Sequence, residues 1–326
     1  MSRFVTRVFD RFFTPRLPEP YAGPSRRWLV WVLLCLVMVI FPGLGFLSAL
    51  IGLADVIAGR PVDLLGDYSL LLVVANIGFT AVPIAMVWGF LRITGDRLMR
   101  IGLVAKPARQ TAHETWWAFV WIFGVCGAIS IVLDRAILQI PYVERLTADV
   151  QIGASMSFAD LAITGISAAI CAGLLEEIVV LGFAYRMLER LGLSDRAILV
   201  ILVALRMSFH LYYGLTAIVL LPWAFASVIY YRRYRRLWPL IIGHAAWDIY
   251  AILSSASMVA EFAGLAVMAL MTIIAIIVAI LRWRRARRGP LLTLEIPRPR
   301  PAWVDDRGAL LGSGGPHQLP SATALI

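Results

Sequence analysis

Long apolar runs separated by short polar segments dominate the pattern of hydrophobic positions along this chain. A helix needs about 20 apolar residues to cross the hydrocarbon core of a bilayer, and eight runs come near that length. By residue number they are 28–53, 70–91, 116–133, 157–190, 197–213, 215–231, 237–253 and 260–281. The pattern therefore predicts an all-α polytopic membrane protein with about eight transmembrane helices. Pro42 and Gly43 predict a kink in the first run.

Arginines gather in every second connection between the predicted helices. The basic segments are 1–27, 92–109, 186–196, 232–236 and the flank that follows residue 281, whereas 54–68, 134–149 and 254–259 hold few arginines. Basic loops are retained in the cytoplasm during insertion. We therefore predict a multi-pass protein of the cell membrane with both termini cytoplasmic.

Composition supports the membrane class and divides the chain. Hydrophobic residues make up 60% of the sequence and the mean hydropathy is +0.82, well above a soluble domain. The net charge of +10 comes mostly from arginines that flank the apolar runs, so membrane lipid is the expected partner and nucleic acid is not. The predicted regions are a basic segment (1–27), N-terminal transmembrane helices (28–156), a transmembrane core (157–283), and a basic, then Pro/Gly/Ser-rich, disordered tail (284–326).

Three of the apolar runs contain ionisable residues at positions where a membrane span rarely has any. They are Glu176 and Glu177 in the fourth run, Arg206 and His210 in the fifth, and His244 and Asp248 in the seventh. Such groups are costly at membrane depth, so they must face one another or a wet cavity, and they mark a functional site. Spacing of four residues places His244 with Asp248, and Arg206 with His210, on one helix face.

The residue types point to a metal-assisted hydrolytic site. Imidazoles and a carboxylate at one depth suit a zinc ion, so we predict a divalent metal held by His210, His244 and Asp248. A glutamate beside such an ion can take a proton from bound water. Two alternatives stay open. A lone histidine in a membrane is often a hydrogen-bonded packing residue, and Asp248 could orient His244 without binding the ion itself.

The order of these motifs resembles the CPBP family of intramembrane metalloproteases, which contains CAAX prenyl endopeptidases and bacteriocin-processing or self-immunity (Abi-type) proteins. The resemblance covers about residues 160–255. It rests on a Glu-Glu pair, a histidine on the next helix, and His-x-x-x-Asp after an arginine-rich turn and Trp-Pro. It implies a membrane core with an intramembrane active-site cavity, and a peptidase acting on a membrane-associated peptide or protein, prenylated or of bacteriocin type.

The resemblance also implies roles for single residues. Glu176 matches the water-activating glutamate of the family, and Glu177 is its neighbour in the pair. His210 and His244 match the two family histidines, and Asp248 matches the Asn/Asp position that closes the third motif.

Two positions depart from the family pattern. The first motif usually continues to an arginine where this chain has Leu181, and the second usually has phenylalanine where this chain has Arg206. The helices on either side of residues 192–195 form a hairpin, and Leu181 and Arg206 are equally far from its centre. We therefore expect Arg206 to replace the missing arginine in space and hold Glu177 ionised while Glu176 acts on water. The alternative is that Arg206 points toward a polar cavity or phosphate headgroups.

Two other classes of function stay open. Intramembrane acids and histidines also serve proton relays, which would suit a proton- or ion-coupled carrier. A non-catalytic membrane scaffold or immunity protein, which binds a membrane helix of a partner, is the third hypothesis.

Overall fold

A computed structural model describes residues 27–63, 70–103, 107–137, 139–140, 150–151 and 156–287. The chain divides into two compact units, residues 1–277 and 278–326, and the architecture below is that of the first unit. The predictions for residues 1–26, and for the tail from residue 288 onward, lie outside the described residues.

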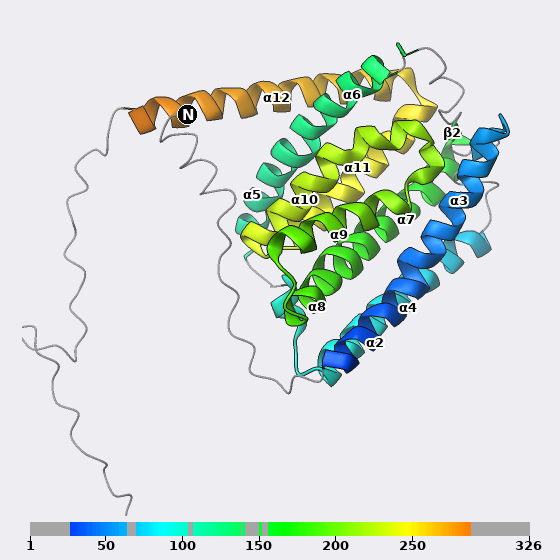
Figure 1. The fold of residues 1–326 in the computed structure, drawn as a ribbon. Coiled ribbons are helices and arrows are strands. Elements are labelled where there is room, and N and C mark those ends of the chain that lie inside the picture. The colour runs from blue at the N-terminus through cyan, green and yellow to red at the C-terminus, as the bar shows by residue number, and fades with distance from the viewer. Residues whose placement is uncertain are drawn as a thin grey trace, which may run out of the picture. The chain divides into compact units, whose positions relative to one another are not determined.

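Helices form almost the whole of the described chain, so the predicted all-α membrane class is confirmed (Figure 1). The α-helices are α2 (Arg27–Met38), α3 (Leu44–Ile57), α4 (Leu70–Ile93), α5 (Ala108–Ala118), α6 (Cys126–Ile137), α7 (Phe158–Leu175), α8 (Tyr185–Arg190), α9 (Asp195–Ser208), α10 (Leu221–Tyr234), α11 (Trp238–Ala256) and α12 (Met258–Arg287). Wide π-helical turns are η1 (Val39–Gly43), η3 (Phe119–Val125) and η5 (Glu176–Ala184), and 3-10 turns are η2 (Leu98–Ile101), η6 (Leu211–Tyr213) and η7 (Leu215–Leu220). Two short strands, β1 (Val62–Asp63) and β2 (Val150–Gln151), pair in parallel with Val62 opposite Val150.

Six helical segments of the described chain are long and apolar enough to cross a membrane by themselves, fewer than the eight predicted. They are Arg27–Ile57, Leu70–Ile93, Ala108–Ile137, Phe158–Arg190, Leu215–Tyr234 and Met258–Arg284. The two other predicted spans became α9, which has only 14 residues, and α11, whose apolar sequence is interrupted by His244 and Asp248. The count of eight therefore stays a prediction.

The fifth predicted helix is wrong over its last turn. It was expected to reach residue 213, but α9 ends at Ser208, and the chain continues through η6 and η7 before α10. Gly214 separates these two turns with φ 63° and ψ −138°, a conformation that is open to glycine and strained for other residues. His210 consequently lies in a turn at the break and not within a helix.

The helix that carries the Glu pair lies at the centre of the bundle. In the most apolar 18-residue stretch of Phe158–Arg190, 61% is buried inside the structure, whereas the corresponding share in α4 is 17%. This span packs against α11 and α4, while α9 lies beside α10 (Figure 1). A Cβ atom added to Gly173 on α7 would lie 2.9 Å from the Ile241 carbonyl oxygen on α11, so the missing side chain permits the close approach.

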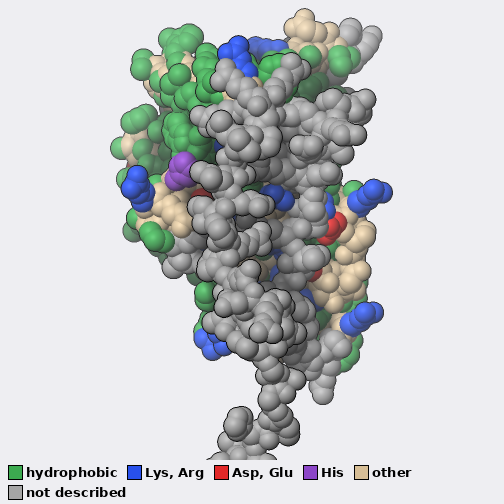
Figure 2. All heavy atoms as spheres, turned by 90° about the vertical axis from the view of Figure 1, so that its left-hand side faces the viewer, with side chains coloured by type: hydrophobic (Ala, Val, Ile, Leu, Met, Phe, Trp, Pro, Cys, Tyr) green, Lys and Arg blue, Asp and Glu red, His purple; other side chains and the backbone are tan. Residues whose placement is uncertain are grey.

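The ends of these helices follow the sequence signals. Ser157 caps α7 by accepting a hydrogen bond from the Asp160 N–H, and Ser194 caps α9 by accepting one from the Ala197 N–H. Exposed side chains of the outer helices are largely hydrophobic, which suits contact with lipid. Figure 2 shows such side chains gathered over the upper part of one face.

Candidate active site

Glu176 and Glu177 open the π-helical turn η5, in the interior of the span Phe158–Arg190. The residues are 8% and 0% exposed. A π-helical turn widens the helix and changes the direction in which neighbouring side chains point, and such turns are frequent at functional sites. Two adjacent carboxyl groups therefore lie in one buried π-helical turn, where they can point in different directions.

Glu177 is held by Arg206 through two charge-assisted hydrogen bonds. Arg206 Nη2 donates to Glu177 Oε1 at 2.7 Å, and Nη1 donates to Oε2 at 3.2 Å. Arg206 itself is fully buried on α9. The pairing expected from the hairpin is therefore confirmed, and the alternative in which Arg206 reaches headgroups is wrong.

His244 on α11 joins the same group from the other side. Its Nδ1 lies 3.0 Å from Glu177 Oε1, and its Nε2 lies 3.4 Å from Asp248 Oδ2. The Asp248 side chain is 29% exposed, whereas the His244 side chain is 4% exposed. This geometry favours the alternative in which Asp248 orients the imidazole. We call Glu176, Glu177, Arg206, His244 and Asp248 the buried cluster.

Glu176 differs from Glu177 because one of its oxygens is uncommitted. Glu176 Oε2 is buried 3.6 Å from Arg206 Nη2, beyond hydrogen-bond distance, and it has no hydrogen-bond partner among the described groups. A buried carboxylate oxygen ordinarily has a partner from the protein or from water. This oxygen is therefore a hydrogen-bond acceptor of the buried cluster that is available to bind a water molecule.

Trp223 on α10 belongs to the site and was missed by the sequence analysis. Arg206 Cζ lies 4.0 Å from the centroid of the Trp223 ring, so the guanidinium is held between an aromatic face and the Glu177 carboxylate. The same ring contacts His244 edge-on, with the centroids 5.0 Å apart. No charge marks this residue, and a tryptophan in an apolar run is typical of packing or lipid contact.

His210 stands apart from the carboxylates. Its Nδ1 lies 2.7 Å from the Arg206 carbonyl oxygen, and its ring stacks on Tyr213 and meets Trp223 edge-on. It makes no ion pair or hydrogen bond with a carboxylate of the described chain. The predicted shared helix face of Arg206 and His210 is therefore wrong, because α9 ends at Ser208, although the His210 ring still contacts the Arg206 backbone. Trp223 lies against both histidine rings.

The donor set does not fit the predicted zinc ion as it is arranged. Within the described ranges, no group of three or more His, Cys, Asp or Glu side chains is placed to hold a metal. Both ring nitrogens of His244 face carboxylates, and His210 does not join them. In addition, the buried charge of Arg206 already balances the Glu177 carboxylate, and it would repel a divalent cation beside it.

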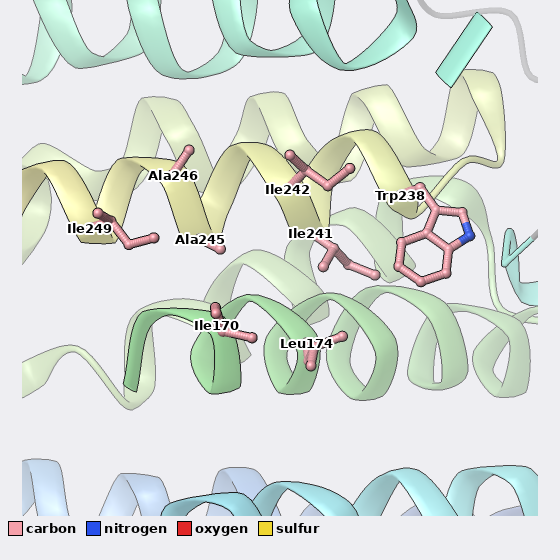
Figure 3. Close-up of a pocket in the computed structure, with 8 residues that line it drawn as sticks. All are labelled: Ile170, Leu174, Trp238, Ile241, Ile242, Ala245, Ala246 and Ile249. Carbon is pink, nitrogen blue, oxygen red and sulfur yellow. The ribbon is translucent and has the colours of Figure 1, made fainter. Parts of the chain in front are cut away.

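An apolar pocket of about 360 Å³ lies beside the site, between α7 and α11. Figure 3 shows Ile170 and Leu174 on α7 across from Ile241 and Ala245 on α11. No residue of the buried cluster lines this pocket. The pocket is therefore separate from the cluster, and its lining side chains are apolar. The predicted cavity around the cluster itself stays a prediction.

Comparison with known families matches residues 158–250 to the type II CAAX prenyl endopeptidases of the Rce1-like family. No curated protein and no solved structure matches the chain. The matched segment begins at the first residue of α7 and ends two residues after Asp248, so it contains the whole buried cluster. The resemblance that the motifs indicated is thereby confirmed: over residues 158–250 this chain is similar to the Rce1-like CAAX prenyl endopeptidases, a family consistent with the CPBP group.

Proposed function

We propose that this protein is an intramembrane endopeptidase in which Glu176 activates the attacking water. The observation that carries the proposal is the difference in hydrogen bonding between two adjacent carboxylates. Glu177 uses both oxygens to bind Arg206, whereas Glu176 keeps Oε2 free of hydrogen bonds. The match of residues 158–250 to a family of prenyl endopeptidases supports the same reaction class.

The chemistry needs one carboxylate that moves a proton and one that stays fixed. Glu176 takes a proton from water as the water oxygen forms a bond to the substrate carbonyl carbon. When the carbon–nitrogen bond breaks, Glu176 returns that proton to the leaving amine. Glu177 cannot serve this purpose, because the guanidinium of Arg206 and the His244 ring occupy its oxygens. Its role is to position those two side chains beside Glu176.

The substrate is a membrane-associated peptide or protein. A prenylated peptide with a C-terminal CAAX sequence is the first candidate, because the matched family is described as CAAX prenyl endopeptidases. A bacteriocin-type precursor is the other substrate class consistent with the motifs. In either case the scissile bond must reach Glu176, which is buried within the helical bundle.

The test uses the full-length protein in liposomes with a fluorogenic farnesylated CAAX peptide, and the same peptide without the lipid. Glu176→Gln removes the base, and Glu261→Gln, at an exposed position on α12, is the matched control. Cleavage lost in Glu176→Gln and kept in Glu261→Gln supports the proposal. Proton flux without cleavage would favour a carrier instead, and neither activity would favour a scaffold.

A further inference from the structure

A second polar site lies at the end of α4, separate from the buried cluster. It is a pocket of about 550 Å³. Its lining consists of Trp88, Leu91, Arg92, Gly95, Asp96, Arg97, Leu98 and Met99. The candidate span Leu70–Ile93 ends within this stretch, so the pocket stands at the depth where lipid headgroups begin.

The backbone of the pocket is fixed by the way α4 ends. The Gly95 N–H donates to the Arg92 carbonyl at 3.1 Å, and the Asp96 N–H donates to the Leu91 carbonyl at 2.7 Å. This pair of bonds is a Schellman motif, which requires a left-handed residue, and Gly95 has φ 70°. The motif turns the chain sharply and sets Arg92 and Arg97 on either side of the turn.

The one carboxylate in the lining is already neutralised from behind. Asp96 has a fully buried side chain, and Arg186 Nε donates to its Oδ2 at 2.9 Å. Arg190 Nη1 lies 3.8 Å from Oδ2, and Arg100 Nη1 lies 3.4 Å from Oδ1. Arg186 is shared with Glu189, whose Oε2 lies 3.6 Å from Arg186 Nη1, but Arg100 and Arg190 also face Asp96. The charge of Asp96 is therefore balanced, so it does not oppose an anion in the pocket.

Two further arginines line the pocket. Arg92 and Arg97 are both exposed, and neither forms an ion pair with a carboxylate in the part of the chain that the structure describes. Arg92 Cζ lies 5.1 Å from the centroid of the Trp88 ring, which holds its guanidinium over an aromatic face. Planar guanidinium groups bind phosphate oxygens through paired hydrogen bonds.

We propose that this pocket binds the phosphate of an anionic phospholipid headgroup between Arg92 and Arg97. A lipid suits the lining better than a free phosphate, because Trp88, Leu98 and Met99 supply apolar surface beside the arginines, and Met99 is 60% exposed. Tryptophan is typical of the interface between headgroups and hydrocarbon. Basic pockets at the ends of transmembrane helices recognise lipid phosphates in this way. The inference is independent of the proposed peptidase activity.

The test measures phospholipids bound to the full-length protein in detergent by native mass spectrometry. Phosphatidylglycerol is titrated against phosphatidylcholine with the same acyl chains, and glycerol 3-phosphate serves as the soluble phosphate. The double variant Arg92→Gln with Arg97→Gln removes the proposed ligands. Arg109→Gln with Arg196→Gln removes the same charge from exposed positions outside the pocket and is the matched control.

We expect phosphatidylglycerol to bind preferentially, and the pocket variant to lose on the order of 10- to 30-fold in affinity, since each arginine near an anionic surface contributes about fivefold. The control pair should lose less than about twofold, and Arg92→Lys with Arg97→Lys should retain most of the binding because the charges remain. Equal losses in both glutamine pairs, or no loss in the pocket variant, would overturn the proposal. Displacement of the lipid by glycerol 3-phosphate at equal concentration would show a soluble phosphate site instead.

Discussion

Arg206 on α9 and Glu177 on η5 form a two-point ion pair in the interior of the protein, with nitrogen–oxygen distances of 2.7 and 3.2 Å. His244 shares the Glu177 oxygen that receives the shorter bond. Removing either partner would leave a charge buried without compensation, and this costs far more than an exposed ion pair is worth. Stability and the arrangement of the site therefore depend on the same contact.

The first prediction concerns this ion pair. Arg206→Gln and Glu177→Gln should each lower the free energy of unfolding by about 3–5 kcal/mol, because each leaves one buried charge unpaired. The double variant should lose less than the sum of the two, since both charges of this pair are removed together. Thermal unfolding of the purified protein in detergent measures the difference, and strictly additive losses would contradict the pairing.

A rescue experiment tests whether the site needs an arginine at position 206 or only an arginine that can reach Glu177. Leu181 is fully buried on η5, the element that carries Glu177. Arg206→Phe alone should abolish peptide cleavage, and Leu181→Arg added to it should restore cleavage if an arginine at either position can hold Glu177. A double variant that folds and inserts but stays inactive would show that the position of the charge on α9 is required.

Glu176→Gln should reduce cleavage by about 100- to 10,000-fold, the range that a general base contributes. The amide has nearly the same volume and it can still accept a hydrogen bond, so the unfolding temperature should change little. Turnover of the farnesylated peptide measures the effect. Full activity in this variant would remove Glu176 from the mechanism, and a collapse of stability would assign it a structural role.

Trp223→Leu should weaken the site without removing a charge. The indole ring covers the Arg206 guanidinium at 4.0 Å, and a desolvated contact of this kind contributes about 2 kcal/mol. We expect a lower unfolding temperature together with reduced cleavage, because Arg206 loses one of the two surfaces that hold it. Trp28→Leu, at a residue that is 61% exposed, is the matched control and should change neither.

Metal removal should leave cleavage intact. The described donors do not form a zinc site as arranged, and Arg206 supplies the positive charge that balances Glu177. Treatment with a membrane-permeant chelator, with metal content measured on the same sample, tests this expectation. Stoichiometric zinc whose loss abolishes cleavage, and whose return restores it, would show that His210, His244 and Asp248 rearrange to bind the ion.

Membrane topology can be tested at the ends of α10 and α12. If α11 and α12 both cross the bilayer, Tyr234 and Arg284 lie on one side and Met258 lies on the other. Single cysteines at these three exposed positions, in a chain without the native cysteines, can be labelled from each side of sealed vesicles. Labelling of positions 234 and 258 from the same side would show that α11 does not cross.

The sequence was sufficient to place Arg206 beside Glu177, because both arms of the hairpin are helical without interruption between those residues and the turn, and the turn is short. It could not place the break after Ser208, because that depends on the backbone angles of Gly214 and on how α3 packs against η6. A Cβ atom at Gly52 on α3 would lie 2.7 Å from the Tyr212 Cβ, a contact that links distant parts of the chain. Trp223 was missed for the same reason, since its neighbours are remote in sequence.

The short length of α9 has a consequence for how the chain enters the bilayer. At about 1.5 Å per residue, its 14 residues extend about 21 Å, less than the hydrocarbon thickness of about 30 Å. Arg206 near its end adds an insertion cost of at least about 2.5–3.5 kcal/mol when it has no partner. The translocation machinery would not release such a segment into lipid by itself. Glu177 leaves the ribosome earlier, so the counter-charge is already present when α9 emerges. If α9 crosses the bilayer, we expect the hairpin of α7 and α9 to insert as one unit.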